Sequence, residues 1–381
     1  MTRRTPAANT LLALSLVFVG TVQGQPAEDA LVTLGRALFF DTALSADRTM
    51  SCATCHDPAR AFTDGRDNPV SGAASLGNDG RTLGHRNAPS LTYASLVPAF
   101  RRHEDGAYTG GLFHDGRAAT LEDQAKQPIV SAAEMALVSP AAVRERVLAN
   151  PAYVDTFERL LGPASLASPD GALDAVATAI AAYERSAEFT SFDSKYDRYL
   201  RGEATLTRDE ELGRILFFSD LVNCSQCHLL DRRENRAGET FTNHRYHNIG
   251  LPPNARLRQL AANTGLDAGL GGHAGDDGRD TRGKFRVPSL RNVAVTGPYM
   301  HNGVFRELKT AIVFYNRFLL DNASSGINPE TGLAWGDAEV PETVDLDLLR
   351  QGQPLSERRI AQLEAFLRTL TDRRYEPLLG R

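Results

Sequence analysis

Two copies of the pattern Cys-x-x-Cys-His contain every cysteine of this 381-residue chain. They comprise Cys52, Cys55 and His56 in the first copy, and Cys224, Cys227 and His228 in the second. Two thiols at this spacing can add to the two vinyl groups of one haem, and the adjacent imidazole can bind the iron as proximal ligand. Zinc and thioredoxin-like sites also use such pairs, but zinc pairs usually lie close in sequence, and neither site needs a histidine after both pairs. These pairs lie 172 positions apart. We therefore expect two covalently attached haem c groups and no disulfide.

The composition is that of a globular protein large enough for two domains. Apolar residues make up 42% of the chain, and typical domains hold roughly 150 residues. Four cysteines are too few for a disulfide scaffold in a chain of this length. The formal charge of −5, from 42 basic and 47 acidic residues, argues against nucleic acid as a partner and gives no basic membrane anchor.

The first 24 residues have the features of a secretory signal peptide. Arg3 and Arg4 precede a short apolar run, 11–18, and small residues follow before Gln25. The alternative is an N-terminal membrane anchor, but the run is shorter than the roughly 20 residues that span a bilayer. We expect a mature protein that starts near Gln25, is periplasmic and is not embedded in the membrane.

An internal repeat organises the mature chain. The segment Leu-Gly-Arg-x-Leu-Phe-Phe precedes each Cys-x-x-Cys-His motif, at 34–40 and at 212–218. Further matching segments follow in the same order in both halves, and each half ends in an expected amphipathic helix, 172–184 and 356–371, with Ser356 as N-cap of the latter. Strand signals are scarce. We predict a mostly α fold with two cytochrome c-like haem domains related by duplication, 25–200 and 201–381, joined between Phe192 and Glu210.

The two expected iron sites differ in one aligned position. His114 and His301 match in the repeat, and fourteen residues after them lie Pro128 in the first half and Tyr315 in the second. Proline cannot bind iron, whereas a phenol can, so we expect an open first haem and a closed second haem. Tyr315 could also belong to a core face of its helix, because apolar residues recur around it at helical spacing.

Two polar residues follow His114 in the first half. Gln124 offers an amide that can orient a bound peroxide, and Glu134 offers a carboxylate that can take a proton from one peroxide oxygen and return it to the other. The glycine-rich segment 265–283 reads as a surface loop. His244 lies among polar residues and is expected to be solvent-exposed.

Several long motifs, in order, resemble the bacterial di-haem cytochrome c peroxidase superfamily, and within it the MauG-like branch. The resemblance runs from about Leu31 to Leu370 and includes both haem motifs, both Leu-Gly-Arg-x-Leu-Phe-Phe segments and the segments 113–117, 296–303 and 314–317. It implies that His56 is the proximal ligand of a peroxidatic haem and His228 that of an electron-transfer haem. It also implies Gln124 and Glu134 as distal catalytic residues, with Pro128 beside them.

The resemblance extends to metal ligands. Asn87, Thr296 and Pro298 match positions that hold a structural calcium between the haems. Family peroxidases usually have methionine at the place of Tyr315, whereas the MauG-like branch has tyrosine there, as this chain does. An anionic phenolate would favour higher oxidation states of the iron, whereas methionine favours Fe(II).

Three departures from the family pattern matter for function. Asn78 stands where family peroxidases bring a histidine onto the resting first haem, so that site should be open; His85 is nearby but reads as a surface residue. His114 replaces the usual tryptophan between the haems, where it would organise hydrogen bonds rather than carry charge. Val222 lies near the place where MauG has a surface tryptophan.

Three functions are consistent with the sequence. The leading one is a peroxidase that reduces hydrogen peroxide at the first haem, stores the second oxidising equivalent on the second haem and takes electrons from a small cytochrome c or cupredoxin. The second is a maturation enzyme that oxidises Trp or Tyr side chains of a partner protein. The third is a non-catalytic electron carrier with two haems.

Overall fold

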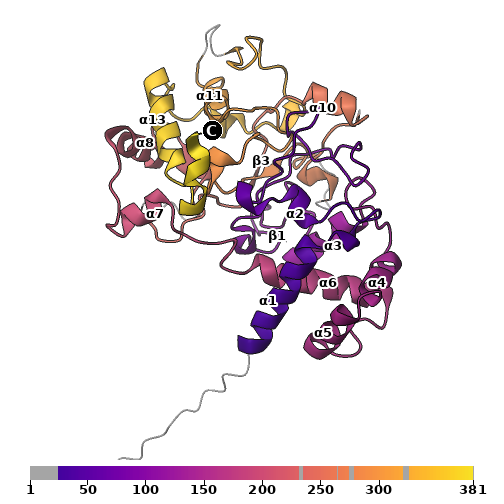
Figure 1. Cartoon of the computed structure of the whole chain (residues 1–381). Coiled ribbons are helices and arrows are strands. Elements are labelled where there is room, and N and C mark those ends of the chain that lie inside the picture. Colours follow the sequence, from indigo (N-terminus) through magenta and orange to yellow (C-terminus); the bar gives the residue numbers. More distant parts are fainter. Residues whose placement is uncertain (1–24, 231–234, 264, 274–278, 321–325, 381) are drawn as a thin grey trace, which may run out of the picture.

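The computed structural model describes residues 25–230, 235–263, 265–273, 279–320 and 326–380 (Figure 1). The expected signal peptide, 1–24, lies outside the described residues. The α-helices are α1 Gln25–Phe40, α2 Cys52–Cys55, α3 Leu121–Val130, α4 Pro140–Leu148, α5 Pro151–Leu161, α6 Pro169–Glu184, α7 Lys195–Leu200, α8 Arg208–Phe218, α9 Cys224–Cys227, α10 Ala255–Leu260, α11 Leu308–Asn316, α12 Leu346–Leu349 and α13 Glu357–Arg368. The strands are β1 Arg101–Arg102, β2 Tyr108–Thr109, β3 Tyr246–His247 and β4 Phe285–Arg286. The prediction of a mostly helical chain with few strands is confirmed.

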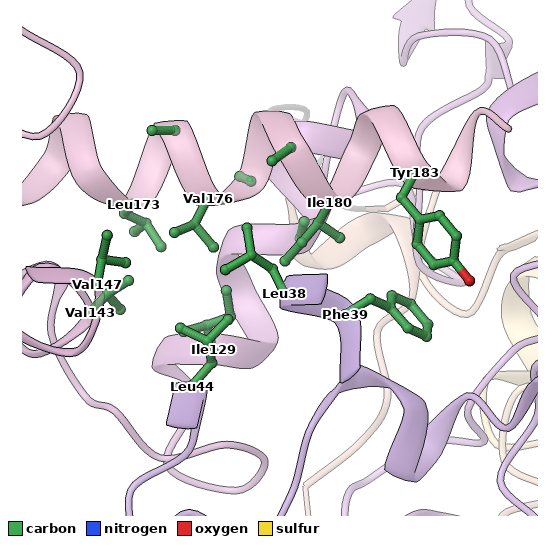
Figure 2. Close-up of a cluster of buried hydrophobic side chains, with 14 of the residues drawn as sticks. Leu38, Phe39, Leu44, Ile129, Val143, Val147, Leu173, Val176, Ile180 and Tyr183 are labelled. Carbon is green, nitrogen blue, oxygen red and sulfur yellow. The ribbon is translucent and has the colours of Figure 1, made fainter. Parts of the chain in front are cut away.

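A first core forms where α1 packs along α6, with α3 and α4 also against α6 (Figure 2). Helix α6 begins with Pro169 after the N-cap Ser168, whose hydroxyl accepts a hydrogen bond from the Gly171 N–H. Its alanine-rich sequence leaves room for the neighbours. A Cβ atom at Gly35 of α1 would lie 1.8 Å from the Ala179 carbonyl oxygen, so only glycine permits this close approach.

A second core repeats this arrangement with α8 and α13. A Cβ atom at Gly213 of α8 would lie 1.8 Å from the Gln362 carbonyl oxygen. Ser356 caps α13 as predicted, since its side chain accepts from the Arg359 N–H. The expected helices 172–184 and 356–371 are thus confirmed, with α6 starting three residues earlier and α13 ending three residues sooner. Tyr196 of α7 belongs to this second core.

The short strands join the two halves of the chain. β1 pairs with β2 and β3 pairs with β4, and a bridge between Thr109 and Arg245 joins the two two-stranded sheets. The Tyr246 hydroxyl donates to the Gly110 carbonyl oxygen at 2.5 Å, and the Arg286 N–H donates to the His114 carbonyl oxygen at 2.8 Å. The segment before α3 is therefore held directly against the segment that follows the second haem motif.

The described part of the segment 265–283 lies largely at the surface, as expected, with Leu266 44% exposed, but it also contains a buried anchor. Leu270 is only 1% exposed and packs with Tyr108 and Tyr246. Asp267 pairs with Arg86 at 2.6 Å. Glycines signal turns, but they do not say whether the turns carry a buried anchor. Over the described ranges, every helix is too short or too polar to cross a membrane.

Candidate haem sites

The first Cys-x-x-Cys-His motif forms α2 and the residue that follows it. Ser51 and Thr54 cap the helix reciprocally, and the three-residue spacing puts Cys52 and Cys55 on one face. The His56 Nδ1 atom lies 3.0 Å from the Phe62 carbonyl oxygen. A carbonyl can only accept, so Nδ1 carries the proton and the Nε2 lone pair is left for a metal.

The second motif has the same geometry. Cys224 and Cys227 lie at the two ends of α9, and the His228 Nδ1 atom lies 3.2 Å from the Phe241 carbonyl oxygen. Burial lowers the pKa of His228 to about 4 and also lowers that of His56, so both imidazoles are neutral. All four cysteines are free thiols. Each motif therefore offers two thiols and one neutral imidazole nitrogen, the donor set that fits a haem c.

Helix α3 and the turn after it carry the expected distal residues. Gln124 and Pro128 are four residues apart and share one side of α3, while Ala125 faces the core. The chain then folds back, so that the Met135 N–H donates to the Pro128 carbonyl oxygen at 3.1 Å. This turn brings the backbone next to Glu134 back to Pro128, at the end of the helix that carries Gln124. Gln124, Pro128 and Glu134 are called the distal group below.

Glu134 lies within electrostatic reach of the first motif. Burial raises the pKa of its carboxyl, against a hydrogen bond from Ser131 and the charge of Arg117. The charge of Glu134 in turn raises the pKa of Cys52 and of Cys55. A carboxyl in this setting can exchange a proton closer to neutral pH than a free glutamate can.

The segment around Asn78 lies against the same turn. The Asn78 N–H donates to the Glu134 carbonyl oxygen at 2.8 Å, and a Cβ atom at Gly77 would lie 2.4 Å from the Ala133 carbonyl oxygen. Asn78 is thus next to the distal group, where its side chain cannot bind iron as a histidine would. His85 is exposed and lines a small cavity near Asp267.

Tyr315 lies on α11 and within electrostatic reach of the second motif. Its pKa is raised by burial and by Cys227 and Cys224. The core position of this helix is taken by the neighbouring Phe314, which is fully buried against Phe305 and Trp335. Tyr315 is only partly buried and lies outside the core clusters, which disfavours a purely structural role.

His114 and His301, which match in the repeat, meet through one residue. The His114 Nε2 atom lies 3.0 Å from the Asn87 carbonyl oxygen, and the Asn87 N–H donates to the His301 carbonyl oxygen at 2.8 Å. Burial lowers the pKa of His114 to about 4 and that of His301 to about 3, so both rings are neutral. The His301 ring stacks on Phe285, with 3.5 Å between the ring centroids.

The residues expected at a calcium site lie near this junction. The Asn87 Nδ2 atom donates to the Gly72 carbonyl oxygen at 3.2 Å, and a Cβ atom at Gly72 would lie 3.4 Å from the Pro298 ring. Asn87 and Pro298 are therefore close to each other, and Thr296 lies two residues before Pro298. Within the described residues, no group of three or more His, Cys, Asp or Glu side chains could hold a metal. A calcium site here would use carbonyl and amide oxygens, ligands that calcium accepts.

His244 and Arg286 lie close to each other at the contact between the two halves of the chain. His244 is 4% exposed, so the prediction of a solvent-exposed ring is wrong; the Gly110 N–H donates to its carbonyl oxygen. The charge of Arg286 reaches this ring, and the Arg286 guanidinium contacts the Phe113 carbonyl oxygen. A local sequence pattern does not reveal the contacts with Gly110 and Phe113, because each lies more than a hundred positions away along the chain.

The comparisons with known proteins place the chain in a family. Residues 29–205 match the family model of di-haem cytochrome c peroxidase. The methylamine utilization protein MauG of Paracoccus denitrificans (strain Pd 1222) is 51% identical over 372 residues, which cover 97% of this chain and 95% of that protein. The chain belongs to the di-haem cytochrome c peroxidase family. It is therefore an oxidoreductase of the peroxidase class, which acts on peroxide or on a protein substrate and works with two haem groups.

Two further relatives agree with this membership. The cytochrome c551 peroxidase of Pseudomonas aeruginosa is 32% identical and covers 81% of this chain and 76% of its own length. The crystal structure of the di-haem peroxidase BthA from Burkholderia thailandensis superimposes with a TM-score of 0.79 at 33% identity, over 91% of this chain and 86% of that one. A non-catalytic electron carrier does not fit a family of oxidoreductases.

Proposed function

We propose that this family member reduces hydrogen peroxide at a haem attached to Cys52 and Cys55 and bound by His56. The observation that carries the proposal is the distal group. Glu134 in this group is a partly buried carboxyl with a raised pKa, and it follows a helix that carries the Gln124 amide and has Pro128, which cannot bind iron, one turn later. The haems, when bound, supply an iron that accepts peroxide and a second iron that stores the second oxidising equivalent.

The chain's own residues would act in order around the peroxide. The Gln124 amide would orient the peroxide. The Glu134 carboxylate would take a proton from one peroxide oxygen and return it to the other, which would leave as water. Pro128 supplies no ligand and keeps the site open, and neutral His114 holds the backbone between the two sites through Asn87.

The second haem, attached to Cys224 and Cys227, would be bound by His228 and Tyr315. What supports this ligand pair is the free Nε2 side of His228 and the reach between Tyr315 and both cysteines. Electrons would come from a small cytochrome c or cupredoxin.

The remaining assignments follow the same reasoning. Asn87, Thr296 and Pro298 would hold a structural calcium, supported by the shared contact with Gly72. Residues 25–200 and 201–381 would be duplicated haem domains, supported by the matching contacts of Gly35 and Gly213. Residues 1–24 would direct export to the periplasm and then be removed.

A second candidate function is the maturation of a partner protein by oxidation of its Trp or Tyr side chains. The 51% identity to MauG and the presence of Tyr315 favour it. His114 and Val222 stand where tryptophans would carry the oxidising hole, which disfavours it. Rapid turnover of peroxide with a reduced cytochrome c or cupredoxin as sole donor would support the peroxidase.

The ligand assignment is tested by electron paramagnetic resonance of the resting ferric protein. We expect one high-spin haem and one low-spin haem. Tyr315→Phe should convert the low-spin signal to high-spin with unchanged haem content, because it removes only the hydroxyl. Tyr299→Phe is the matched control: its hydroxyl donates to the Val293 carbonyl oxygen in the same half, and its loss should leave the spectrum unchanged. An unchanged low-spin signal in Tyr315→Phe would contradict the ligand assignment, and two low-spin signals in the wild type would contradict the open first haem.

A further inference from the structure

Arg286 is an inward-facing guanidinium without a carboxylate partner among the described residues. Its Nε atom is buried and has no hydrogen-bond partner. Its Nη1 and Nη2 atoms make only long contacts, 3.5 Å each, to the carbonyl oxygens of Val287 and Phe113. Burial lowers its pKa. An uncompensated buried charge is costly, so a site that keeps one normally contains an anion as well.

Two other inward-facing arginines of this chain have their charge balanced by carboxylates. Arg291 pairs with Asp197 at 2.5 Å, and both side chains are nearly fully buried. Arg86 pairs with Asp115 and Asp267 at 2.7 and 2.6 Å. Arg286 differs from both because the described chain supplies no acidic group to it.

A second unpartnered nitrogen lies beside Arg286. The Nδ1 atom of His244 is buried and has no hydrogen-bond partner. Burial and the charge of Arg286 lower the pKa of this ring to about 3, so the ring is neutral and can present one N–H. The Arg286 Nε atom and the His244 Nδ1 atom are therefore two potential donors in one region that have no hydrogen-bond acceptor among the described residues.

The backbone around Arg286 connects it to the second haem motif. The Arg286 N–H donates to the His114 carbonyl oxygen at the junction. One residue later, the Val287 carbonyl oxygen accepts from the Thr242 hydroxyl at 2.7 Å, and the Pro288 backbone contacts the His228 ring. The backbone of 286–288 thus links His114 to the proximal ligand of the second site, and the Arg286 guanidinium projects from this link.

We propose that Arg286, assisted by His244, binds a propionate carboxylate of the second haem and raises the reduction potential of that haem. The inference rests on the proposed function, which places a haem at His228. A carboxylate matches the planar donor arrangement of a guanidinium, and each haem brings two carboxylates. A fixed positive charge at this place favours the reduced iron, so its removal lowers the potential.

The test is a spectroelectrochemical titration of the holoprotein. Arg286→Leu should shift the midpoint potential of the second haem to a lower value. Arg286→Lys, which keeps the charge, should have a midpoint potential close to that of the wild type. Arg245→Leu is the matched control, because Arg245 is one residue from β3 but exposed, and its removal should leave both potentials near the wild-type values. His244→Leu should give a smaller shift in the same direction, and it keeps the test decisive if Arg286→Leu fails to fold.

The outcomes separate the inference from the proposed function. Unchanged potentials of both haems in Arg286→Leu and His244→Leu, with two haems still present by pyridine haemochrome, would overturn the inference alone. A wild-type potential that depends on the chloride concentration, with the dependence lost in Arg286→Leu, would show a soluble anion in place of the propionate and would also overturn it. Fewer than two haems in the wild type would contradict the proposed function itself.

Discussion

The proposed role of Glu134 depends on the turn that follows α3 and fixes its backbone. The Met135 N–H returns to Pro128 and the Asn78 N–H holds the Glu134 carbonyl oxygen, so the backbone on both sides of the carboxyl is fixed. A carboxyl that is held and partly withdrawn from water can serve as base and then as acid without moving far. The sequence indicated Glu134 as a candidate because a polar residue of this type follows His114 in the first half. The burial of His244 and the unpaired charge of Arg286 were not predictable from it, since distant segments create both.

The substitution Glu134→Gln should slow peroxide turnover about 100-fold or more, the usual scale for loss of a general acid–base group. Burial raises the pKa of Glu134, so the wild-type rate should fall as the pH falls through a range above the ordinary value of about 4.3, where the carboxylate becomes protonated. The variant should lack this fall. Stopped-flow measurement between pH 4 and 8 checks both points.

Glu122→Gln is the control for that measurement. Glu122 also lies on α3 but pairs with Arg185 near the surface, so its loss should leave the rate near that of the wild type. Wild-type rates in Glu134→Gln at every pH would exclude the acid–base assignment.

At the scale of elements, the helix pairs α1–α6 and α8–α13 have the same packing. Gly35 lets α1 touch α6, and Gly213 lets α8 touch α13, with the same 1.8 Å to a facing carbonyl oxygen. Each pair carries a short haem-motif helix beside it, since α2 packs on α1 and α9 packs on α8. The repeated Leu-Gly-Arg-x-Leu-Phe-Phe segment indicated that the two halves share local structure, but not which helices pack together. The exact facing residues, Ala179 and Gln362, depend on helix crossing geometry and could not be read from it.

Alanine at either glycine should destabilise the protein. A Cβ atom at 1.8 Å from a backbone oxygen forces the two helices apart, and overpacking of this kind costs about 1–3 kcal/mol. Thermal unfolding followed by circular dichroism should show lower midpoints for Gly35→Ala and Gly213→Ala. Gly326→Ala is the control, because a Cβ atom there would meet nothing within 4 Å. Unfolding midpoints equal to that of Gly326→Ala would mean that the helices can move apart to accept the added Cβ atom at no cost in stability.

At the scale of the whole molecule, the two cores are joined by polar contacts as much as by apolar ones. Arg86 pairs with Asp115 and Asp267, and its guanidinium also lies over the Phe285 ring. The Tyr93 hydroxyl donates to Asp372 at 2.6 Å across the same boundary. The sequence repeat indicated two similar units but not this joint, because the contacts that cross it, Arg86 with Asp267 and Tyr93 with Asp372, join residues 181 and 279 positions apart.

The Arg86 pairs predict a defined pH dependence. Burial alone would raise the pKa of Asp267, but the hydrogen bonds and charge of Arg86 outweigh it and lower the pKa to about 2. The stabilisation is therefore complete above the unfolded-state value of about 3.9 and is lost as the pH falls towards 2. Arg86→Met should lower the unfolding free energy at pH 7 by roughly 3 kcal/mol, and the difference from wild type should narrow between pH 4 and 2.

Urea unfolding at pH 7, 4 and 3 measures that difference. Arg201→Met, which breaks an exposed pair with Glu203, should change little at any of these pH values. If the difference in unfolding free energy between Arg86→Met and the wild type stays constant with pH, the Asp115 and Asp267 carboxylates do not stabilise the contact between the two halves.

The packing of α1 against α6 also sets an order of events during synthesis. A chain emerges from its N-terminus, so α1, α2 and the thiols of Cys52 and Cys55 are outside the channel while α6 is still to come. The first core cannot close over Gly35 until α6 arrives. The same order holds for α8, α9 and α13. Under the proposed attachment of two haems, each pair of thiols would be accessible before its half closes, and the later helix would complete the core against which Cys52, Cys55 and Cys224 pack.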